Sequence, residues 1–149
     1  MTLKVGIISA AWGAFAHLPA WRAVPGIEVV GICTSRRETA EKAAAQHGIP
    51  RAFWSAEDMA ADPGIDIVDC GTRPAIREAM VLAALAHGKH VYNGIPFARD
   101  LDGARRLHDA WAAAGTVGVV DAYAQWLPAH ALARRHVEDG TLGRPFGGT

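Results

Sequence analysis

The segment LKVGIISAAWGAFAHLPAW (Leu3–Trp21) determines the fold class of this chain. Its first six residues, Leu3–Ile8, form an almost unbroken apolar run, which is typical of a strand buried on both faces of a sheet. A turn of small residues follows the run and leads into a helical, alanine-containing stretch. The segment therefore predicts the opening strand, turn and helix of a parallel α/β sheet.

Short β-rich runs alternate with longer helical runs along the rest of the chain. Strands are expected at Leu3–Ile8, Ile27–Cys33, Ala52–Trp54, Ile65–Cys70, His90–Tyr92 and Val117–Val120. Helices are expected at Thr39–His47, Ala56–Ala61, Ile76–His87, Leu101–Ala114 and Pro128–Asp139. Glycines 48, 88, 115 and 140 end four of these helices, and Ser55 and Asp100 are candidate N-caps. The pattern predicts a doubly wound, mostly parallel Rossmann-type sheet with helices on both faces, and a ligand site at the carboxyl ends of its strands.

Composition excludes several classes of protein. The 149 residues carry 15 basic and 15 acidic side chains, so no net charge attracts nucleic acid or a membrane surface. No apolar run approaches the roughly 18 residues that span a bilayer, and no signal-peptide pattern opens the chain. Cys33 and Cys70 lie in apolar stretches, which predicts reduced, buried thiols and a cytoplasmic protein. The spacing of the seven histidines favours structural roles over a metal site.

The first strand-to-helix turn is the first candidate site. A dinucleotide-binding turn has the pattern Gly-x-Gly-x-x-Gly, and here its glycine positions hold Ser9, Ala11 and Ala14, with Gly13 next to the third. The start of the helix still directs N–H groups and a positive dipole end toward an anion. A positive φ at Ala11 or Ala14 would add strain. Two interpretations stay open: a turn that holds a pyrophosphate, and a small-residue turn that has lost its nucleotide.

The end of the second strand indicates which dinucleotide would bind. NAD-binding domains place an acidic residue there to hold the ribose hydroxyls, but this chain has Thr34, Ser35, Arg36 and Arg37. Paired guanidinium groups suit a 2′-phosphate, so NADP(H) is favoured over NAD(H). The alternative is that both arginines are simply solvated at the start of a helix.

Three blocks resemble the N-terminal half of the Gfo/Idh/MocA oxidoreductases: Lys4–Trp21, Val29–Ile49 and Ile65–Ala98. The resemblance implies a Rossmann domain with a nicotinamide cofactor, acting on a sugar-like or cyclic alcohol or ketone. It also implies that Thr72, Arg73 and Pro74 line the nicotinamide side, in place of a Thr-Pro-Asn-type segment. The residues expected to hold the cofactor are Ser9, Ala11, Trp12, Gly13, Ala14, Thr34, Ser35, Arg36, Arg37, Thr72, Arg73, Pro74 and Gly94.

One departure from this family concerns proton transfer. The family's Glu-Lys-Pro segment, whose lysine serves in proton transfer, is matched here by Gly94-Ile95-Pro96, and a family histidine is matched by Arg77. Isoleucine cannot accept or donate a proton, although such a group typically contributes 10²–10⁴-fold. Asn93, Asp121 and Tyr123 are the nearby replacements, and the sequence does not choose among them. His17 is expected to pack or cap rather than to take part in the chemistry.

A second departure is length, because the family adds a substrate domain after the Rossmann domain. Residues 1–125 are expected to form the dinucleotide-binding domain, and residues 126–149 a linking helix and the start of a missing or truncated second domain. Trp126 and Leu127 would then lie exposed, and a dimer through the last helix or the sheet edge is expected. The other tryptophans, apart from Trp12 in the turn, are expected to be core or interface residues. The alternative to an enzyme is a non-catalytic nucleotide-binding or regulatory Rossmann module, which uses the nucleotide pocket as a sensor or leaves it empty.

Overall fold

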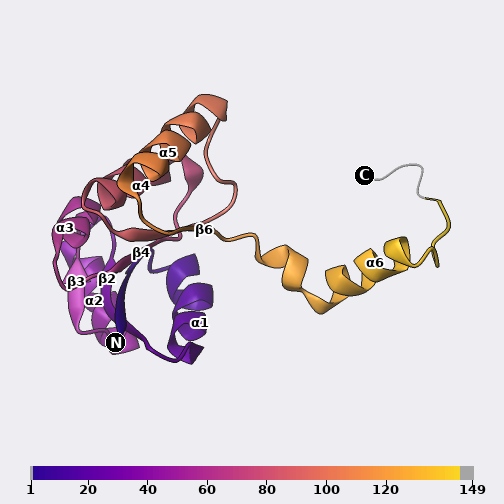
Figure 1. Ribbon diagram of the computed structural model, residues 1–149. Coiled ribbons are helices and arrows are strands. Elements are labelled where there is room, and N and C mark those ends of the chain that lie inside the picture. The colour runs from indigo at the N-terminus through magenta and orange to yellow at the C-terminus, as the bar shows by residue number, and fades with distance from the viewer. Residues whose placement is uncertain (1, 145–149) are drawn as a thin grey trace.

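The computed structural model describes residues 2–144 and contains a six-stranded, all-parallel sheet (Figure 1). The strand order is β3-β2-β1-β4-β5-β6, which is the doubly wound Rossmann order and confirms the predicted fold class. The strands are β1 Leu3–Ile8, β2 Ile27–Cys33, β3 Arg51–Phe53, β4 Ile67–Cys70, β5 His90–Asn93 and β6 Gly118–Val120. The chain runs outward from β1 to β3, then returns to the other side of β1 with β4, so β1 and β4 flank the switch point.

Two groups of helices cover the sheet. The helical elements are η1 Gly13–His17 (a π-helix), α1 Leu18–Ala23, α2 Arg37–His47, α3 Ala56–Ala61, α4 Pro74–Ala86, α5 Leu101–Ala114, η2 Tyr123–Trp126 (a 3₁₀-helix) and α6 Pro128–Glu138. Residues of α1 and α2 pack with Val5, Ile7 and Ile32 in one buried cluster. Residues of α3, α4 and α5 pack with Ile8 and Val68 in the other. The sheet therefore has a core on each face, as its apolar strands predict.

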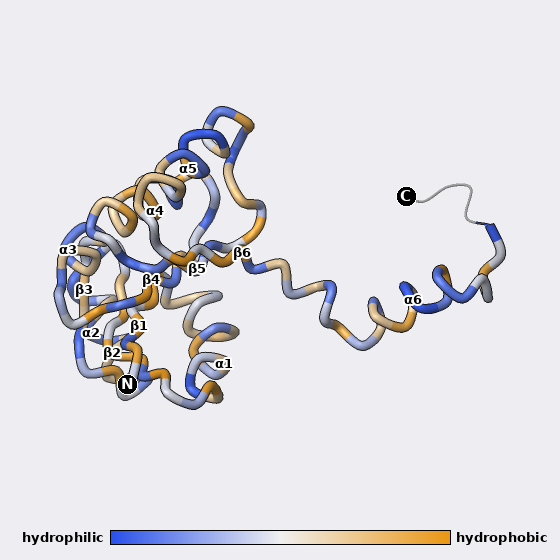
Figure 2. The backbone as a smooth tube through the Cα atoms, in the orientation of Figure 1, coloured by the Kyte–Doolittle hydropathy of each residue, from blue (hydrophilic) through white to orange (hydrophobic). Residues whose placement is uncertain are grey.

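The strands carry most of the hydrophobic colouring in Figure 2, and the outer turns of the helices are more hydrophilic. Both predicted N-caps are confirmed, because Ser55 Oγ accepts from the N–H of Asp58 at 3.2 Å and Asp100 Oδ1 from that of Gly103 at 2.8 Å. The four helix-ending glycines have φ between 60° and 77°, which suits a residue without Cβ. Helix α4 begins at Pro74, two residues before the expected start, because proline's fixed φ fits a first helical position.

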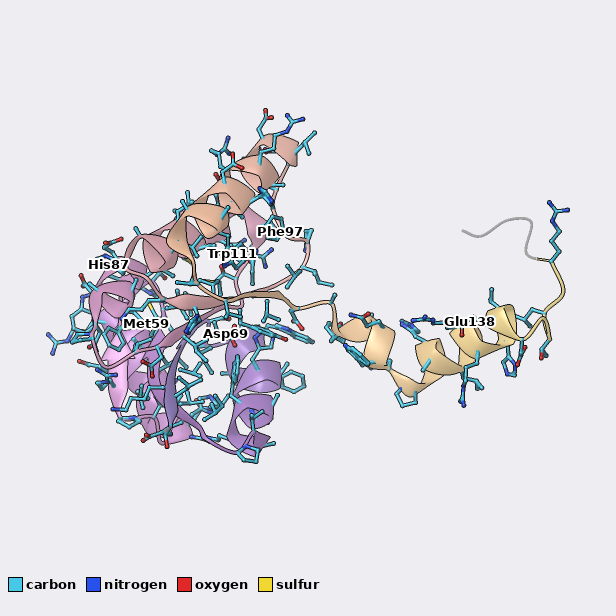
Figure 3. All side chains as sticks on the ribbon, viewed as in Figure 1. Met59, Asp69, His87, Phe97, Trp111 and Glu138 are labelled. Carbon is cyan, nitrogen blue, oxygen red and sulfur yellow. The ribbon has the colours of Figure 1, made fainter. Side chains whose placement is uncertain are left out.

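One tryptophan lies outside the core. Trp54 is not a core residue: it is 48% exposed, and the Arg37 guanidinium lies 5.2 Å from its ring centre. A cation over an indole face is favourable at the surface, so this ring does not require burial. Trp111 does pack inside, where it stacks on Phe97 at 5.7 Å (Figure 3).

The segment after β6 leaves the body of the domain, and α6 extends away from the sheet (Figure 1). Trp126 is 79% exposed and Leu127 is also exposed, as expected. The domain division after residue 125 stays a prediction, and residues 145–149 of the expected linking segment lie outside the described residues. Within residues 2–144, no helix is both long enough and apolar enough to cross a membrane.

Candidate functional site

A cavity of about 620 Å³ opens at the switch point, where the carboxyl ends of β1 and β4 meet. Ligands of doubly wound sheets bind at this edge. The cavity is lined by Ser9, Ala11, Trp12, His17, Gly71, Thr72, Arg73, Ile76, Arg77, Gly94, Ile95, Asp121 and Tyr123. These residues come from the segments that follow β1, β4, β5 and β6, so the fold gathers four distant parts of the chain at one place.

The structure brings together six of the predicted cofactor residues in this lining: Ser9, Ala11, Trp12, Thr72, Arg73 and Gly94. Two others, Gly13 and Ala14, are buried beneath the turn, and Pro74 begins α4 beside the cavity. The remaining four, residues 34–37, follow β2 on the same edge of the sheet but do not line this cavity. The predicted residues thus form two groups at the carboxyl edge of the sheet, one around the cavity and one after β2.

Gly13 allows the turn to lie close to the first strand. A Cβ at this position would lie 2.7 Å from Ile7 Cγ2, which is far inside contact distance. The third glycine of the Gly-x-Gly-x-x-Gly pattern lets the helix pack closely on the strand, and Ala14 holds that position here. Gly13, its neighbour, provides this close approach instead. The Ser9 hydroxyl accepts from the N–H of Ala11 at 3.2 Å, which orders the exposed loop before the helix.

The backbone strain of this turn is at Ser9 and not at Ala11 or Ala14. Ser9 has φ 154°, a region that side chains with a Cβ rarely adopt. Neither Ala11 nor Ala14 has a positive φ, so the strain considered for those two positions does not arise. Strained residues of this kind cluster at functional sites, where the surrounding structure holds them in place.

We expect Ser9→Gly to be more stable than Ser9→Ala by about 1 kcal/mol. Both variants lose the hydroxyl, but only glycine adopts this φ without steric strain, and the entropy of unfolded glycine offsets part of the gain. Urea unfolding of the two variants measures the difference. Glu41 in α2 is the control, because there the glycine variant should be the less stable of the pair. Equal stability of the two Ser9 variants would show that the turn is unstrained.

A buried polar network lies behind the cavity, centred on His17, which is 6% exposed. His17 Nδ1 lies 2.9 Å from both oxygens of Asp69, a β4 residue with no exposed surface (Figure 3). Trp21 Nε1 donates to Asp69 Oδ2 at 2.7 Å. On the other side of the ring, His17 Nε2 lies 3.2 Å from Asp121 Oδ2, and Tyr92 Oη donates to Asp121 Oδ1 at 2.5 Å. The imidazole therefore lies between two carboxylates.

The electrostatics of this network favour a protonated histidine. Burial by itself lowers the pKa of His17, but the hydrogen bond and charge of Asp69, together with Asp121, outweigh it and raise that pKa above its ordinary 6.5. Burial and the bond to Asp121 raise the pKa of Tyr92 far above its usual range, so its phenol remains a donor. Sequence reasoning overlooked Asp69, although an acidic residue inside an apolar strand was the available signal, since a buried carboxylate needs a partner.

Arg77 joins the segment that follows β4 to the segment that follows β5. Its buried guanidinium donates to the carbonyl oxygens of Thr72, at 2.9 Å, and Pro96. Gly94 is needed beside it, because a Cβ there would lie 2.6 Å from Arg77 Nη1. Ile95 lines the cavity next to this contact and offers it an apolar side chain.

The three predicted replacements for the lysine occupy different places. Asn93 is fully buried, and its amide donates to the carbonyl of Phe97 at 3.0 Å. Asp121 and Tyr123 both line the cavity. The structure therefore separates Asn93 from the site and leaves Asp121 and Tyr123 in it.

The arginine pair after β2 is divided between two environments. Arg37 Nε donates to Glu41 Oε1 at 2.7 Å, and its guanidinium lies over Trp54. The Arg36 side chain forms no hydrogen bond or ion pair with the rest of residues 2–144. The hydroxyl of Thr34 donates to the carbonyl oxygen of Arg36 at 2.9 Å and so shapes the loop. Arg36 is thus the residue of the pair that is available to an external anion.

The remaining candidates have structural positions. Cys33 and Cys70 are buried free thiols, as predicted, and burial raises the pKa of Cys33 to about 12. His108 is solvated, as predicted, with 79% of its side chain exposed. Across residues 2–144, no cluster of three or more histidine, cysteine or acidic residues is arranged to hold a metal ion.

Comparisons with known proteins agree with this geometry. The model of an oxidoreductase family with an NAD-binding Rossmann fold matches residues 3–122. D-apiose dehydrogenase from Paraburkholderia graminis is 31% identical over 97% of this chain, and 1,5-anhydro-D-fructose reductase from Ensifer adhaerens is 32% identical over 81% of it. The crystal structure of an Agrobacterium radiobacter oxidoreductase in complex with NAD⁺, L-tartaric acid and magnesium superposes with a TM-score of 0.85 at 27% identity, covering 98% of this chain and 43% of that one.

These matches cover only part of each relative. The aligned region is 39% of the D-apiose dehydrogenase and 36% of the anhydrofructose reductase. The shared region is in each case the part that corresponds to the sheet and cavity described above.

Proposed function

This chain belongs to the Gfo/Idh/MocA oxidoreductase family, and we propose that its switch-point cavity holds the nicotinamide end of NADP(H) in an oxidoreductase for sugar-like or cyclic alcohols and ketones. The observation that carries the proposal is the cavity of about 620 Å³ at the β1–β4 edge, which is lined by the first turn and, among others, by Thr72, Arg73, Gly94 and Ile95. When bound, the cofactor would supply or accept a hydride.

The residues of the first turn fit a dinucleotide. Gly13 lets the backbone approach the strand, and the side chains facing the cavity from the turn are small except for Trp12. A large, exposed ring at the mouth suits stacking against a planar ligand. Arg73 and Arg77, which line the same cavity, provide positive charge near an anionic ligand.

The residues at the end of β2 favour NADP(H) over NAD(H). Position 34 holds a threonine where NAD-binding domains hold an acidic residue, and Arg36 has a free guanidinium one residue before α2. A guanidinium binds a phosphate with paired, charge-assisted hydrogen bonds. Arg37 supports this role less directly, because Glu41 already neutralises it.

The substrate class is proposed from chemistry shared by the relatives. The two relatives named above are a dehydrogenase and a reductase of sugar derivatives. In this chain the polar residues Asp121, Tyr123, Arg73 and Arg77 line the cavity. Such groups suit hydrogen bonds with a polyhydroxylated ring.

Titration with NADPH and NADH tests the proposed cofactor site. We expect NADPH to bind more tightly, and Arg36→Ala to weaken NADPH binding about tenfold while NADH binding stays unchanged, because the residue contacts only the extra phosphate. Nicotinamide fluorescence measures both affinities. Arg105→Ala is the matched control, since that arginine lies on the exposed surface of α5. Equal affinities that do not respond to Arg36→Ala would contradict the NADP(H) preference.

The second candidate function is a Rossmann module that binds or senses a nucleotide without catalysis. Ile95 favours it, because the residue occupies the cavity wall where the resemblance expects a proton-transferring lysine. If a dinucleotide binds and no group in the site gains or loses a proton on binding, this second function is supported. If neither NADPH nor NADH binds, the chain is instead a Rossmann module whose pocket holds neither of these nucleotides.

A further inference from the structure

His17 forms a wall between two hollows of the domain. One side of the residue lines the switch-point cavity, and another lines a smaller cavity of about 210 Å³ beside α1 and Tyr92. The imidazole is held by edge contacts with the rings of Trp12, at 6.3 Å, and Tyr92, at 5.3 Å. A titratable ring is therefore fixed at the floor of the proposed site.

The two nitrogens of this ring have different partners. Nδ1 donates to Asp69, which is fully buried and also accepts from Trp21. Nε2 is buried and lies 3.2 Å from Asp121 Oδ2, but the alignment does not make a hydrogen bond, so this atom lacks a full partner. An unsatisfied buried nitrogen next to a carboxylate that itself lines the cavity is an arrangement that calls for explanation.

We propose that His17 and Asp121 together hold the proton that this site exchanges with its ligand, in place of the lysine that Ile95 replaces. This inference rests on the proposed function. Asp69 is the positioning residue, because it fixes the ring through Nδ1 and directs Nε2 toward Asp121, as a carboxylate orients a histidine in other proton-transfer sites.

The proposed step balances with a dihydronicotinamide as reductant. Reduction of a ketone adds a hydride to carbon and a proton to oxygen; the hydride comes from the cofactor and the proton from the His17–Asp121 pair. The products are the alcohol, the oxidised cofactor and a pair with one proton fewer, which water restores. Oxidation of an alcohol runs through the same transfers in reverse.

The charges around the pair give the proposal a measurable consequence. Asp69 from β4 and Tyr92 from β5 face the pair from inside the domain, while Arg73 and Arg77 face the cavity from the start of α4. With its proton the cluster of His17, Asp69 and Asp121 has a net charge of about −1, and without it about −2. An oxidised nicotinamide ring is positive and a reduced ring is neutral, so loss of the proton should favour the oxidised cofactor.

The experiment measures the affinities of NADP⁺ and NADPH between pH 6 and pH 9. We expect the ratio of the two dissociation constants, oxidised over reduced, to fall about tenfold as the pH rises through the pKa of His17. The ratio cancels the titration of the 2′-phosphate, which both cofactors share. His17→Gln should abolish this pH dependence, Asp69→Asn and Asp121→Asn should each move it to lower pH, because both carboxylates raise the pKa of His17, and His108→Gln should leave it unchanged.

A second measurement requires no variant and so does not depend on the folding of a substituted core. Imidazole ¹⁵N spectra of the wild-type protein should show the His17 ring shifting when NADPH replaces NADP⁺, and the His108 ring staying unchanged. Binding of both cofactors with a ratio independent of pH, or a pH dependence that survives His17→Gln, would overturn this inference and leave the proposed cofactor site intact. Failure of both cofactors to bind would overturn the two together.

Discussion

Asp69→Ala is expected to lower the free energy of unfolding by about 3–5 kcal/mol, because it leaves two buried donors without an acceptor. In the folded protein Asp69 accepts from His17 Nδ1 and Trp21 Nε1, and none of its surface is exposed. Truncation removes the carboxylate but leaves the imidazole and the indole N–H inside the domain. Urea unfolding followed by circular dichroism measures the loss.

Two variants separate the network from the general effect of losing an acidic residue. Asp109→Ala should change stability by less than about 0.5 kcal/mol, because that side chain is 79% exposed. The double variant His17→Leu/Asp69→Leu should lose less stability than the sum of its single variants, since it removes both charges of the buried pair. Additive losses in the double variant would show that the two side chains do not interact.

The same pair makes stability depend on pH in a defined direction. Because the folded-state pKa of His17 is raised above its ordinary 6.5, protonation stabilises the folded state. That contribution is fully present below about pH 6.5 and is lost as the pH rises through the raised pKa. Wild-type protein should therefore be less stable at pH 9 than at pH 6, and Asp69→Ala should show a smaller loss over that interval.

Ile7→Ala is expected to have the second largest effect, a loss of about 2–5 kcal/mol. Ile7 is fully buried in the core between β1 and α1, and its Cγ2 methyl defines the distance at which Gly13 passes the strand. The truncation creates a cavity directly beneath the first turn. We therefore expect weaker NADPH binding as well as lower stability, with thermal unfolding and nicotinamide fluorescence as the two measurements.

A second substitution tests the contact between Ile7 and Gly13. Gly13→Ala alone should be destabilising, because its Cβ would lie 2.7 Å from the Ile7 methyl. In the Ile7→Ala background the same change should cost less, since that methyl is gone. Val119→Ala on the exposed part of β6 is the control for simple loss of apolar atoms. An unchanged effect of Gly13→Ala in both backgrounds would mean that the contact does not set the turn.

The sequence determined the fold class and the edge of the sheet at which the site lies. Apolar runs such as Leu3–Ile8 can be buried only in a sheet covered on both faces, and the helix-ending glycines show where each crossover turns back. The position of the ligand-binding loops follows from that topology, because the carboxyl ends of all the parallel strands lie at one edge of the sheet. Six of the thirteen residues expected to hold the cofactor, residues 9, 11, 12, 72, 73 and 94, line the cavity at that edge.

Only the tertiary structure decided which side chains share a proton. His17, Asp69, Tyr92 and Asp121 are separated by up to about a hundred positions along the chain, and no local pattern links them. The sequence also did not predict the backbone strain at Ser9 or the pairing of Arg37 with Glu41. Hydrophobic periodicity and turn residues act over a few neighbouring positions, whereas contacts between buried polar groups depend on how distant strands are arranged in the sheet. The sequence therefore located the site, and the folded packing selected the groups that give it its chemistry.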